Sequence, residues 1–308
     1  MNLSKTDYKR IRKLVYRNAR PVDLARWKYH FEKGSQMDIV EVLSAYQNED
    51  GGFGHALEAD SWNPNSTPIQ TTTAIEKLTE INFNDNQHPV VLGILNYLDS
   101  GAEFVHQRWN NTVASNNDYP HAPWWHTDSS STSRSEYNPT ATIVGFILEF
   151  ADRDGRLFKL GMSVAEELIE LFLHNSKLEM HPLKCLVAMI NSIEKANLQN
   201  HLLVTKVREE VNQQITPLIQ RDSQDWHGYS CRPSTFIKSP DSSLYEENKT
   251  LVSEELDYLL TTRNADGVWD LTWKWNAFDK EFAISEHWWT TELIIENMLF
   301  LRAFDRLQ

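Results

Sequence analysis

The chain has 308 residues, of which 41% are hydrophobic and 24% are charged, and its net charge is −13. These proportions are ordinary for a globular protein with a large core. The excess of negative charge argues against a protein that binds nucleic acid.

The first predicted element is a basic amphipathic helix at 5–18. Residues 1–33 carry ten Lys or Arg and three Asp or Glu, a net charge of +7, whereas the rest of the chain carries −20. Tyr8, Ile11, Leu14 and Val15 form an apolar stripe among these charges. Such a helix can lie on an anionic membrane surface. We favour the alternative, in which it packs on the acidic remainder of the chain.

Helical periodicity continues along most of the chain. Ile39, Val42 and Leu43 follow the i, i+3, i+4 spacing of an amphipathic helix. Residues 142–148 and 293–301 are apolar almost all round, which is typical of helices buried on every side. No linker divides the chain, so we expect one domain, 1–308. The remaining predicted helices are 22–33, 36–47, 68–82, 87–99, 139–152, 159–175, 181–196, 199–214, 246–262 and 287–305.

Cysteine usage and hydropathy predict where the protein resides. Cys185 and Cys231 cannot build a disulfide framework. No signal-peptide pattern is recognisable, and no apolar run reaches about 18 residues, the length that spans a membrane. We therefore expect a reducing, cytoplasmic location.

Two stretches, 47–54 and 263–270, share the pattern Asn-x-Asp-Gly-x-aromatic after a predicted helix. A glycine just after a helix can take the left-handed conformation that ends the helix. The Asp can accept hydrogen bonds from nearby amides, and the aromatic residue can pack back on the preceding helix. The repetition indicates a helical array built from one recurring unit.

Four long loops, at 48–67, 100–138, 221–245 and 263–286, each precede a predicted helix. Loops of this length in a compact protein are usually functional. Amphipathic helices that alternate with all-apolar helices predict an all-α (α/α) toroid of eleven to twelve helices in two concentric rings, with the loops at one rim. An open solenoid of helical hairpins is the alternative. Polar or Pro residues suited to a helix start follow the loops: Thr67-Pro68, Asn138-Pro139, Ser242-Ser243 and Ser285-Glu286.

The first loop contains two candidate catalytic carboxylates, Glu58 and Asp60, followed by Trp62 as a candidate substrate-binding residue. In extended backbone, residues two apart point the same way. Paired carboxylates suit general acid–base catalysis, because repulsion and burial separate their pKa values. Alternatively, both carboxylates accept hydrogen bonds from backbone amides and cap the helix that begins near Pro68.

The second loop combines aromatic, His and acidic residues. We expect Trp124, Trp125 and His126 to form a binding wall, with Asp128 as a candidate catalytic residue. The Ser-rich run 129–135 between aromatic flanks resembles a lid; it could equally be a disordered insertion held by the two Trp. His121 and Tyr137, at the two ends of this loop, are further substrate-binding candidates.

The third and fourth loops add His227 and Trp288 as substrate-binding candidates and Glu286 and His287 as catalytic ones. His287 is expected at a helix N-terminus, which lowers the pKa of a His, next to a carboxylate that suits acid–base chemistry. The alternative is an N-terminal helical turn whose Trp residues pack into the ring.

The segment Gln47-x-x-Asp50-Gly51-Gly52-Phe53 resembles the Gln-x-x-Asp-Gly-x-Trp/Phe repeat of the terpenoid cyclase and protein prenyltransferase β-subunit superfamily. Asp266-Gly267-Val268-Trp269 is similar to its second half, with Arg263 in place of the Gln. The resemblance implies turns that brace the loop between an outer and an inner helix. It also implies inner helices around a cavity for a prenyl chain or polyene.

The catalytic signatures of that family are largely missing. Neither Asp-x-Asp-Asp, which protonates alkenes, nor Asp-Asp-x-x-Asp, which holds magnesium and diphosphate, occurs in the chain. The zinc-binding Asp-x-Cys of the prenyltransferases is also absent, because Tyr229 stands two residues before Cys231. Asp225, Cys231 and His287 could bind zinc only with a different spacing, so we expect neither a metal nor another cofactor.

Three functions fit the sequence. The first is an enzyme that binds or cyclises an isoprenoid by acid catalysis in a central cavity, with aromatic rings stabilising cations. The second is a carbohydrate-active (α/α)-barrel hydrolase or lyase that uses paired carboxylates and stacked Trp. The third is a non-catalytic toroid that binds a ligand or a protein. The fold alone does not separate them; the first is preferred, with an apolar or sugar-like small molecule as the partner.

Overall fold

The computed structural model describes residues 1–128, 136–175, 177–200 and 202–308 and is mostly helical, with 59% helix and 4% strand. The all-α prediction is confirmed. Two short strands, β1 (Phe104–Val105) and β2 (Arg108–Trp109), pair antiparallel. The helices of the described residues are α1 (Lys5–Asn18), α2 (Pro21–Phe31), α3 (Gln36–Ser44), α4 (Pro68–Glu80), α5 (Pro89–Asp99), α6 (Thr140–Phe150), α7 (Arg156–Asn175), α8 (Met180–Lys195), α9 (Val204–Leu218), α10 (Tyr245–Thr261) and α11 (Asp279–Ala303).

The chain divides into two compact units. One, which we call the continuous unit, comprises residues 43–215; the other, the split unit, combines residues 1–42 with 216–308. The loops, as far as the structure describes them, contain four short 3₁₀ helices: η1 (Ala114–Asp118), η2 (Pro123–Trp125), η3 (Ser223–His227) and η4 (Pro233–Thr235). The single domain and the toroidal arrangement of its helices stay predictions.

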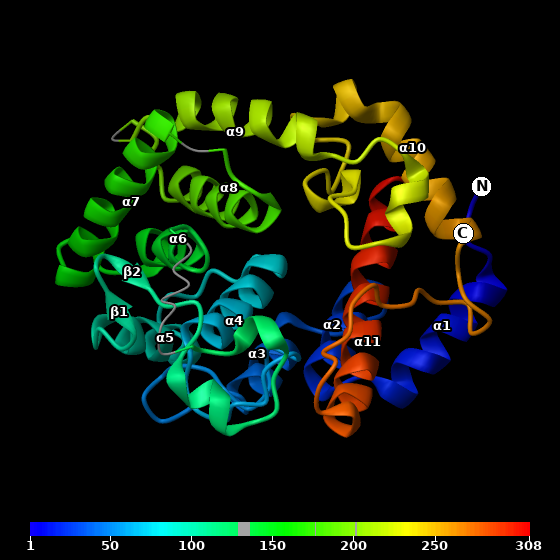
Figure 1. Ribbon diagram of the computed structural model, residues 1–308, viewed down its shortest axis with the longest axis horizontal. Helices are drawn as coiled ribbons and strands as arrows, with labels where there is room; N and C mark the ends of the chain where they lie inside the picture. The colour runs from blue at the N-terminus through cyan, green and yellow to red at the C-terminus, as the bar shows by residue number, and fades with distance from the viewer. Residues whose placement is uncertain (129–135, 176, 201) are drawn as a thin grey trace. The chain divides into compact units, whose positions relative to one another are not determined.

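The continuous unit is built around α6 (Figure 1), which contacts α4, α5, α7 and α8. Every α6 residue from Thr140 to Leu148 is buried, which confirms the prediction for 142–148. Gly145 allows the close approach of α8, because a Cβ at this position would lie 3.0 Å from the Cα of Met189. Burial on all sides explains why this helix has no polar face.

In the split unit, α1, α2 and α11 pack on one another (Figure 1), and α10 contacts α11, η3 and η4. Ile11 and Val15 bury the apolar stripe of α1, and Ser4 caps the helix by accepting the amide of Asp7 at 3.1 Å. The two ends of the chain meet at a bridge between Leu3 and Leu307. None of the helices in the described ranges is long and apolar enough to cross a bilayer.

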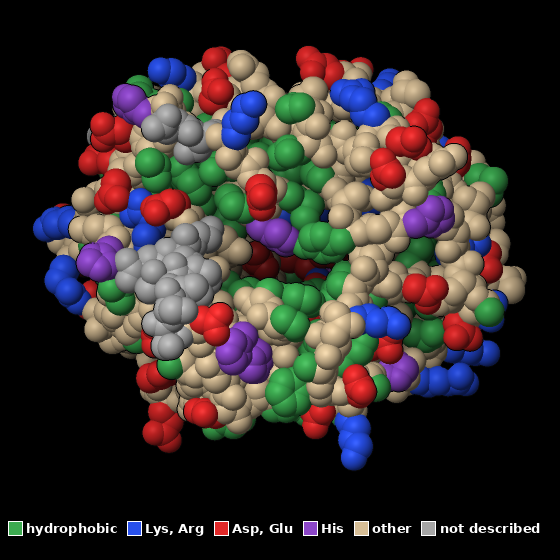
Figure 2. Space-filling model, viewed as in Figure 1, with side chains coloured by type: hydrophobic (Ala, Val, Ile, Leu, Met, Phe, Trp, Pro, Cys, Tyr) green, Lys and Arg blue, Asp and Glu red, His purple; other side chains and the backbone are tan. Residues whose placement is uncertain are grey.

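Charges of both signs are interspersed on the face shown in Figure 2. Basic side chains of α1 lie beside acidic ones of the same unit: Arg10 approaches Asp266 at 4.0 Å, and Arg12 contacts Glu32 at 2.7 Å. Ile11 and Val15 of the positively charged helix are buried in the split unit. The preference for packing on the acidic remainder of the chain over binding to a membrane surface stays a prediction.

The two repeated turns adopt the same backbone structure. The Asn48 amide donates to the carbonyl of Gly52, and the Asn264 amide to that of Val268, both at 2.8 Å. Gly51 and Gly267 have φ values of 89° and 81°, which favour glycine. Neither glycine ends a helix, however, because α3 stops at Ser44 and α10 at Thr261. The glycines instead close a turn several residues beyond the helix.

The first turn is tied to two helices of the continuous unit. Gln47 Nε2 donates to the carbonyls of Gly51 and of Val90 in α5, at 2.9 and 3.0 Å. The amide of Phe53 donates to Thr71 Oγ1 of α4 at 3.1 Å. In the second turn, Trp269 Nε1 donates to a carbonyl of α10, the helix that it follows, at 2.9 Å. The predicted packing of the aromatic residue on the preceding helix is confirmed there.

One predicted helix start is confirmed and another is wrong. Thr67 caps α4 as expected, because its side chain accepts the amide of Gln70 at 3.1 Å. The last helix was expected to begin after Ser285, but α11 begins at Asp279 and Ser285 is fully buried inside it. The acidic residues Asp279 and Glu281 occupy its first turn, where they favour the positive end of the helix dipole.

Candidate functional site

The first and second loops of the continuous unit are joined into one structure, which we call the loop site (residues 55–63 and 119–128). Ser61 and His121 form an antiparallel bridge. The Ala122 amide donates to the carbonyl of Asp60 at 2.8 Å, and the Trp62 amide to that of Pro120 at 2.9 Å. The sequence placed these candidates on separate loops, and the structure brings them together.

A buried glutamine of α4 holds the first of these loops. Gln70 Oε1 accepts the amide of Leu57 at 3.0 Å, and its Nε2 donates to the carbonyl of Asn63 at 2.8 Å. Asn63 in turn donates to Asn116 Oδ1 of η1 at 2.9 Å. These side chains satisfy backbone and amide groups that are buried with the loop, and so they hold its conformation.

Two histidines of the loop site are linked edge to edge. His121 Nε2 lies 3.1 Å from His126 Nδ1, the ring centroids are 5.3 Å apart and the rings are inclined by only 11°. Imidazole N–H groups lie in the ring plane, so a good hydrogen bond between two rings requires nearly coplanar rings. The short N···N distance with a long centroid separation indicates this arrangement rather than face-to-face stacking.

The hydrogen-bond partners of His121 and His126 indicate which of their ring nitrogens carry hydrogen. His121 Nδ1 lies 2.6 Å from the carbonyl oxygen of Tyr119, which can only accept, so this nitrogen carries hydrogen. The Nε2 of neutral His121 therefore accepts from Nδ1–H of His126. Neutral His126 is left with its lone pair on Nε2, which lies 3.6 Å from Asp128 Oδ1. These contacts thus leave Nε2 of His126, on a ring that is 48% exposed, as a proton acceptor.

The surroundings of His126 are accessible to solvent. The side chains of His126 and Asp128 are 48% and 68% exposed, and Trp124 is 45% exposed. Trp125 is half-buried and its Nε1 has no hydrogen-bond partner in the described structure. The predicted wall of Trp124, Trp125 and His126 thus lies within one short segment around η2. The run 129–135, interpreted as a lid, lies outside the described residues.

The reasoning that paired Glu58 with Asp60 is corrected by the structure. Residues 55–60 form turns rather than extended backbone, and His55 and Ala56 have positive φ values. Glu58 Oε1 accepts the amide of Asp60 at 3.4 Å. A carboxylate that accepts a backbone amide is the alternative that we considered for these residues. Glu58 and Trp62 are half-buried and Asp60 is 3% exposed.

Tyr137 is not part of an accessible wall. Its ring is 1% exposed, and its hydroxyl donates to the carbonyl of Leu168 in α7 at 3.4 Å. A large aromatic ring gains more from burial in the core than from exposure on a loop, and its hydroxyl then needs a partner. The structure therefore places Tyr137 among the core residues of the continuous unit.

The remaining candidates belong to the split unit. His227 is exposed, and its Nδ1 lies 3.1 Å from the hydroxyl of Tyr258. Glu286 and His287 are exposed on the third turn of α11, not at its N-terminus. The reason for expecting a helix-dipole effect on His287 is therefore wrong. Trp288 lies under the guanidinium of Arg20, 5.4 Å from the ring centroid.

The structure reveals a buried charge cluster that the sequence analysis missed. Asp23 of α2 contacts Arg20 at 2.7 Å and Arg26 at 3.2 Å, and Arg26 contacts Glu292 of α11 at 2.5 Å. Asp23 and Arg26 are at most 1% exposed. Arg20, the N-cap residue of α2, and Asp23 and Arg26 within the helix recur every three positions, a spacing that places them on one helix face. That spacing was the available signal.

Metal ligation and thiol chemistry gain no support from the described residues. Within 1–128, 136–175, 177–200 and 202–308, no three His, Cys, Asp or Glu side chains are close enough together to hold a metal ion. Asp225 accepts a hydrogen bond from Gln220 Nε2 at 2.8 Å. Burial raises the pKa of Cys185 to about 12, so its thiol is a poor nucleophile.

Comparison with other proteins does not assign the chain to a family. No family model matches it, and neither the curated proteins nor the solved structures contain a match. The resemblance to the terpenoid cyclase superfamily therefore stays a prediction from two short turns. A functional assignment depends on the geometry of the loop site.

Proposed function

We propose that the loop site is an acid–base catalytic centre in which His126 Nε2 accepts a proton from a small neutral hydroxylated substrate, such as a sugar, or from water. The hydrogen-bond chain from the Tyr119 carbonyl through His121 to His126 carries this proposal. It selects the tautomer of His126 whose basic nitrogen faces Asp128. Orientation of a catalytic imidazole by a second group is a recurring feature of acid–base enzymes.

Charge compensation supports the same role. When His126 accepts a proton at Nε2, positive charge develops 3.6 Å from Asp128 Oδ1. A nearby carboxylate stabilises this imidazolium, and the proton remains available for return to the leaving group. The loop site contains two carboxylates that solvent can reach: Glu58 is half-buried and Asp128 is exposed. Cleavage of a glycosidic bond commonly uses a pair of carboxyl groups.

A sugar fits the loop site better than an isoprenoid. The exposed face of Trp124 offers a flat apolar surface with polar groups around it. Carbocation intermediates must be protected from water, whereas His126 and Asp128 are open to solvent. An imidazolium is also a far weaker acid than alkene protonation requires.

The test is hydrolysis of a panel of neutral 4-nitrophenyl glycosides by the full-length protein. We expect turnover of at least one glycoside, and a loss of kcat/KM of roughly 10²–10⁴-fold in His126→Gln. His174→Gln, which changes an exposed histidine of α7 elsewhere in the same unit, should retain activity. A panel without turnover, or equal activity in both variants, would contradict the proposal.

An isoprenoid-handling enzyme is the second candidate, supported by the first turn. Gln47 of this turn bonds both the turn and α5, as expected of a turn that braces neighbouring helices. Native mass spectrometry of the purified protein, followed by organic extraction, distinguishes the candidates. A co-purified isoprenoid favours the second candidate and directs mutagenesis to Asp60. A bound sugar favours the first, and binding without turnover of either class favours a non-catalytic ligand-binding protein.

A further inference from the structure

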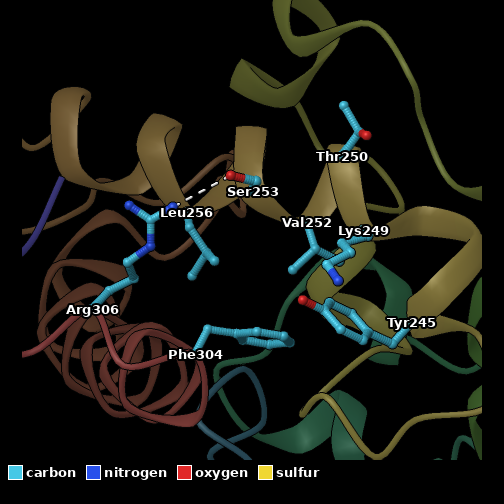
Figure 3. Close-up of a pocket in the computed structure, with 8 residues that line it drawn as sticks. All are labelled: Tyr245, Lys249, Thr250, Val252, Ser253, Leu256, Phe304 and Arg306. Atoms are coloured by element: carbon cyan, nitrogen blue, oxygen red, sulfur yellow. Dashed lines mark hydrogen bonds between the residues drawn. The ribbon is translucent and has the colours of Figure 1, made fainter.

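A cavity of about 450 Å³ opens on the split unit, and none of the candidate residues described above lines it. It lies between one face of α10 and the segment that follows α11 (Figure 3). This volume falls within the range of pockets that bind small molecules. The residues that line it are Tyr245, Lys249, Thr250, Val252, Ser253, Leu256, Phe304 and Arg306.

The middle of the cavity is apolar and aromatic. Val252 and Leu256 of α10 face the ring of Phe304 across it (Figure 3). The rings of Tyr245 and Phe304 are 5.3 Å apart at an angle of 45°. A flat apolar group placed here would exchange water contacts for contacts with aliphatic and aromatic carbon.

Both ends of the cavity are polar. Figure 3 shows the hydroxyl of Tyr245 and the ammonium of Lys249 at one end and Arg306 at the other. Lys249 is exposed, lies 5.8 Å from the Tyr245 ring, and has no ion-pair partner among the residues described in the structure. Its charge is therefore available to a ligand.

Arg306 is held in place by the protein. Its guanidinium donates to Asp257 Oδ1 at 3.1 Å, to Ser253 Oγ at 3.3 Å and to the carbonyl of Met1 at 2.7 Å. These contacts stiffen the Arg306 end of the cavity, where Asp257 is shared between Arg306 and the N-terminal ammonium, 3.6 Å from its Oδ1. Lys249, at the end that it forms with Tyr245, has no such carboxylate partner among the described residues.

We propose that this cavity binds a small aromatic carboxylate. The ring would lie between Phe304 and the pair Val252 and Leu256, and the carboxylate would accept hydrogen bonds from Lys249 Nζ and the Tyr245 hydroxyl. An ammonium and a phenol suit a carboxylate because charge-assisted hydrogen bonds are the stronger kind. This site involves no residue of the loop site and is independent of the proposed catalytic function.

The probes are 2-naphthoate and 2-naphthamide, which share a ring system and differ in charge. Isothermal titration of the full-length protein should show one 2-naphthoate bound per chain, with an affinity about tenfold higher than that of the amide. In NMR spectra, the perturbed methyl groups should be those of Val252 and Leu256.

Variants separate the charge from the apolar contacts. Lys249→Met should bring the two affinities within about twofold of each other, and Tyr245→Phe should weaken naphthoate binding more than naphthamide binding, because a carboxylate is the stronger acceptor. Lys280→Met changes an exposed lysine at the start of α11 and should leave both affinities unchanged. Equal affinity of acid and amide for the wild-type protein overturns the proposal, as does an equal effect of the two lysine variants. Absence of binding up to the solubility limit of both probes also overturns it.

Discussion

Glu255 of α10 is a fully buried carboxyl group that contacts residues in and next to η4 of the same unit. It accepts the amide of Ser234 at 2.7 Å and the hydroxyl of that residue, and Arg232 Nε lies at 3.4 Å. Burial raises the pKa of Glu255, and Arg232 and Ser234 oppose the rise only in part. The carboxyl group therefore connects η4 to α10 and links the stability of this connection to pH.

The raised pKa predicts how stability depends on pH. The folded protein holds the Glu255 proton more tightly than the unfolded chain, so the stabilisation is complete below the unfolded-state pKa and is lost as pH rises through the folded-state pKa. We expect the free energy of unfolding of the wild type to fall relative to that of Glu255→Gln as pH rises above about 4.3. Urea unfolding of both proteins at several pH values measures this difference. Parallel curves would show that Glu255 does not titrate with folding.

Gly51 and Gly101 provide a second prediction at the residue scale. Both have positive φ values, 89° and 78°, but a Cβ on Gly51 would lie 2.1 Å from the Gly93 carbonyl oxygen, whereas none of the surrounding atoms comes within 4 Å at Gly101. Gly101→Ala should cost about 1–2 kcal/mol for the backbone conformation alone. Gly51→Ala must also displace α5 and should cost clearly more, or prevent folding of the continuous unit. Similar losses of unfolding free energy would contradict the close approach of the turn to α5.

At the scale of elements, α2 and α11 are joined by buried charges rather than by apolar contact alone. Arg26 contacts both Asp23 of its own helix and Glu292 of α11. Removing one member of a buried ion-pair cluster takes a partner from each of the charges that it contacts, and this loss destabilises the folded protein. The pairing of these two helices therefore depends on all of the charges being present.

We expect Arg26→Met to lower the free energy of unfolding by about 3–5 kcal/mol, because the buried Asp23 and the half-buried Glu292 lose a shared partner. Arg156→Met is the matched control. Arg156 pairs with Asp99 at 2.8 Å, but its side chain is 74% exposed, so its loss should change stability little. Chemical denaturation measures both values, and a small effect of Arg26→Met would mean that the cluster is hydrated or reorganises.

The starts of α4 and α11 show which helix boundaries a local sequence pattern predicts and which it does not. The start of α4 was predicted correctly because Thr67 and Pro68 act within one turn of the helix. The start of α11 was missed because its first three residues, 279–281, are all charged and Phe278 before them adopts a left-handed conformation. Packing of α11 on α1, α2 and α10 stabilises a helix longer than the local pattern indicates.

At the scale of the whole molecule, the two units differ in how the chain builds them. The core of the continuous unit, α6 with α4, α5, α7 and α8, comes from one uninterrupted stretch. The split unit combines α1 and α2 with α10 and α11, and Leu3 pairs with Leu307 near the two ends of the chain. Local connection lowers the entropic cost of assembling the first core relative to the second.

This difference predicts that a fragment spanning residues 36–218, which includes all of α3 and α9, folds by itself. Its circular dichroism spectrum should be helical and its thermal unfolding cooperative. A fragment of residues 216–308 lacks α1 and α2, on which α11 packs, and should not show a cooperative transition. A 36–218 fragment without cooperative unfolding would mean that the core around α6 requires the rest of the chain.

The sequence by itself determined the all-α class, nine of the eleven predicted helices to within about three residues at each end, and the two repeated turns. The exceptions are the helices predicted at 199–214 and 287–305, which the structure places at Val204–Leu218 and Asp279–Ala303. These features depend on interactions within a few residues: apolar spacing, capping and the conformational freedom of Gly51 and Gly267. The proximity of His121 and His126 to each other is equally local, although its hydrogen-bond geometry is not.

Only the tertiary structure decided which chemical groups face one another. The bridge from Ser61 to His121, the cluster that Arg26 shares with Glu292, and the cavity between Lys249 and Arg306 each join residues far apart in the chain. The composition of a loop shows which side chains are available, but not which of them are buried. Burial and pairing arise from packing between elements, and a local pattern contains no information about that packing.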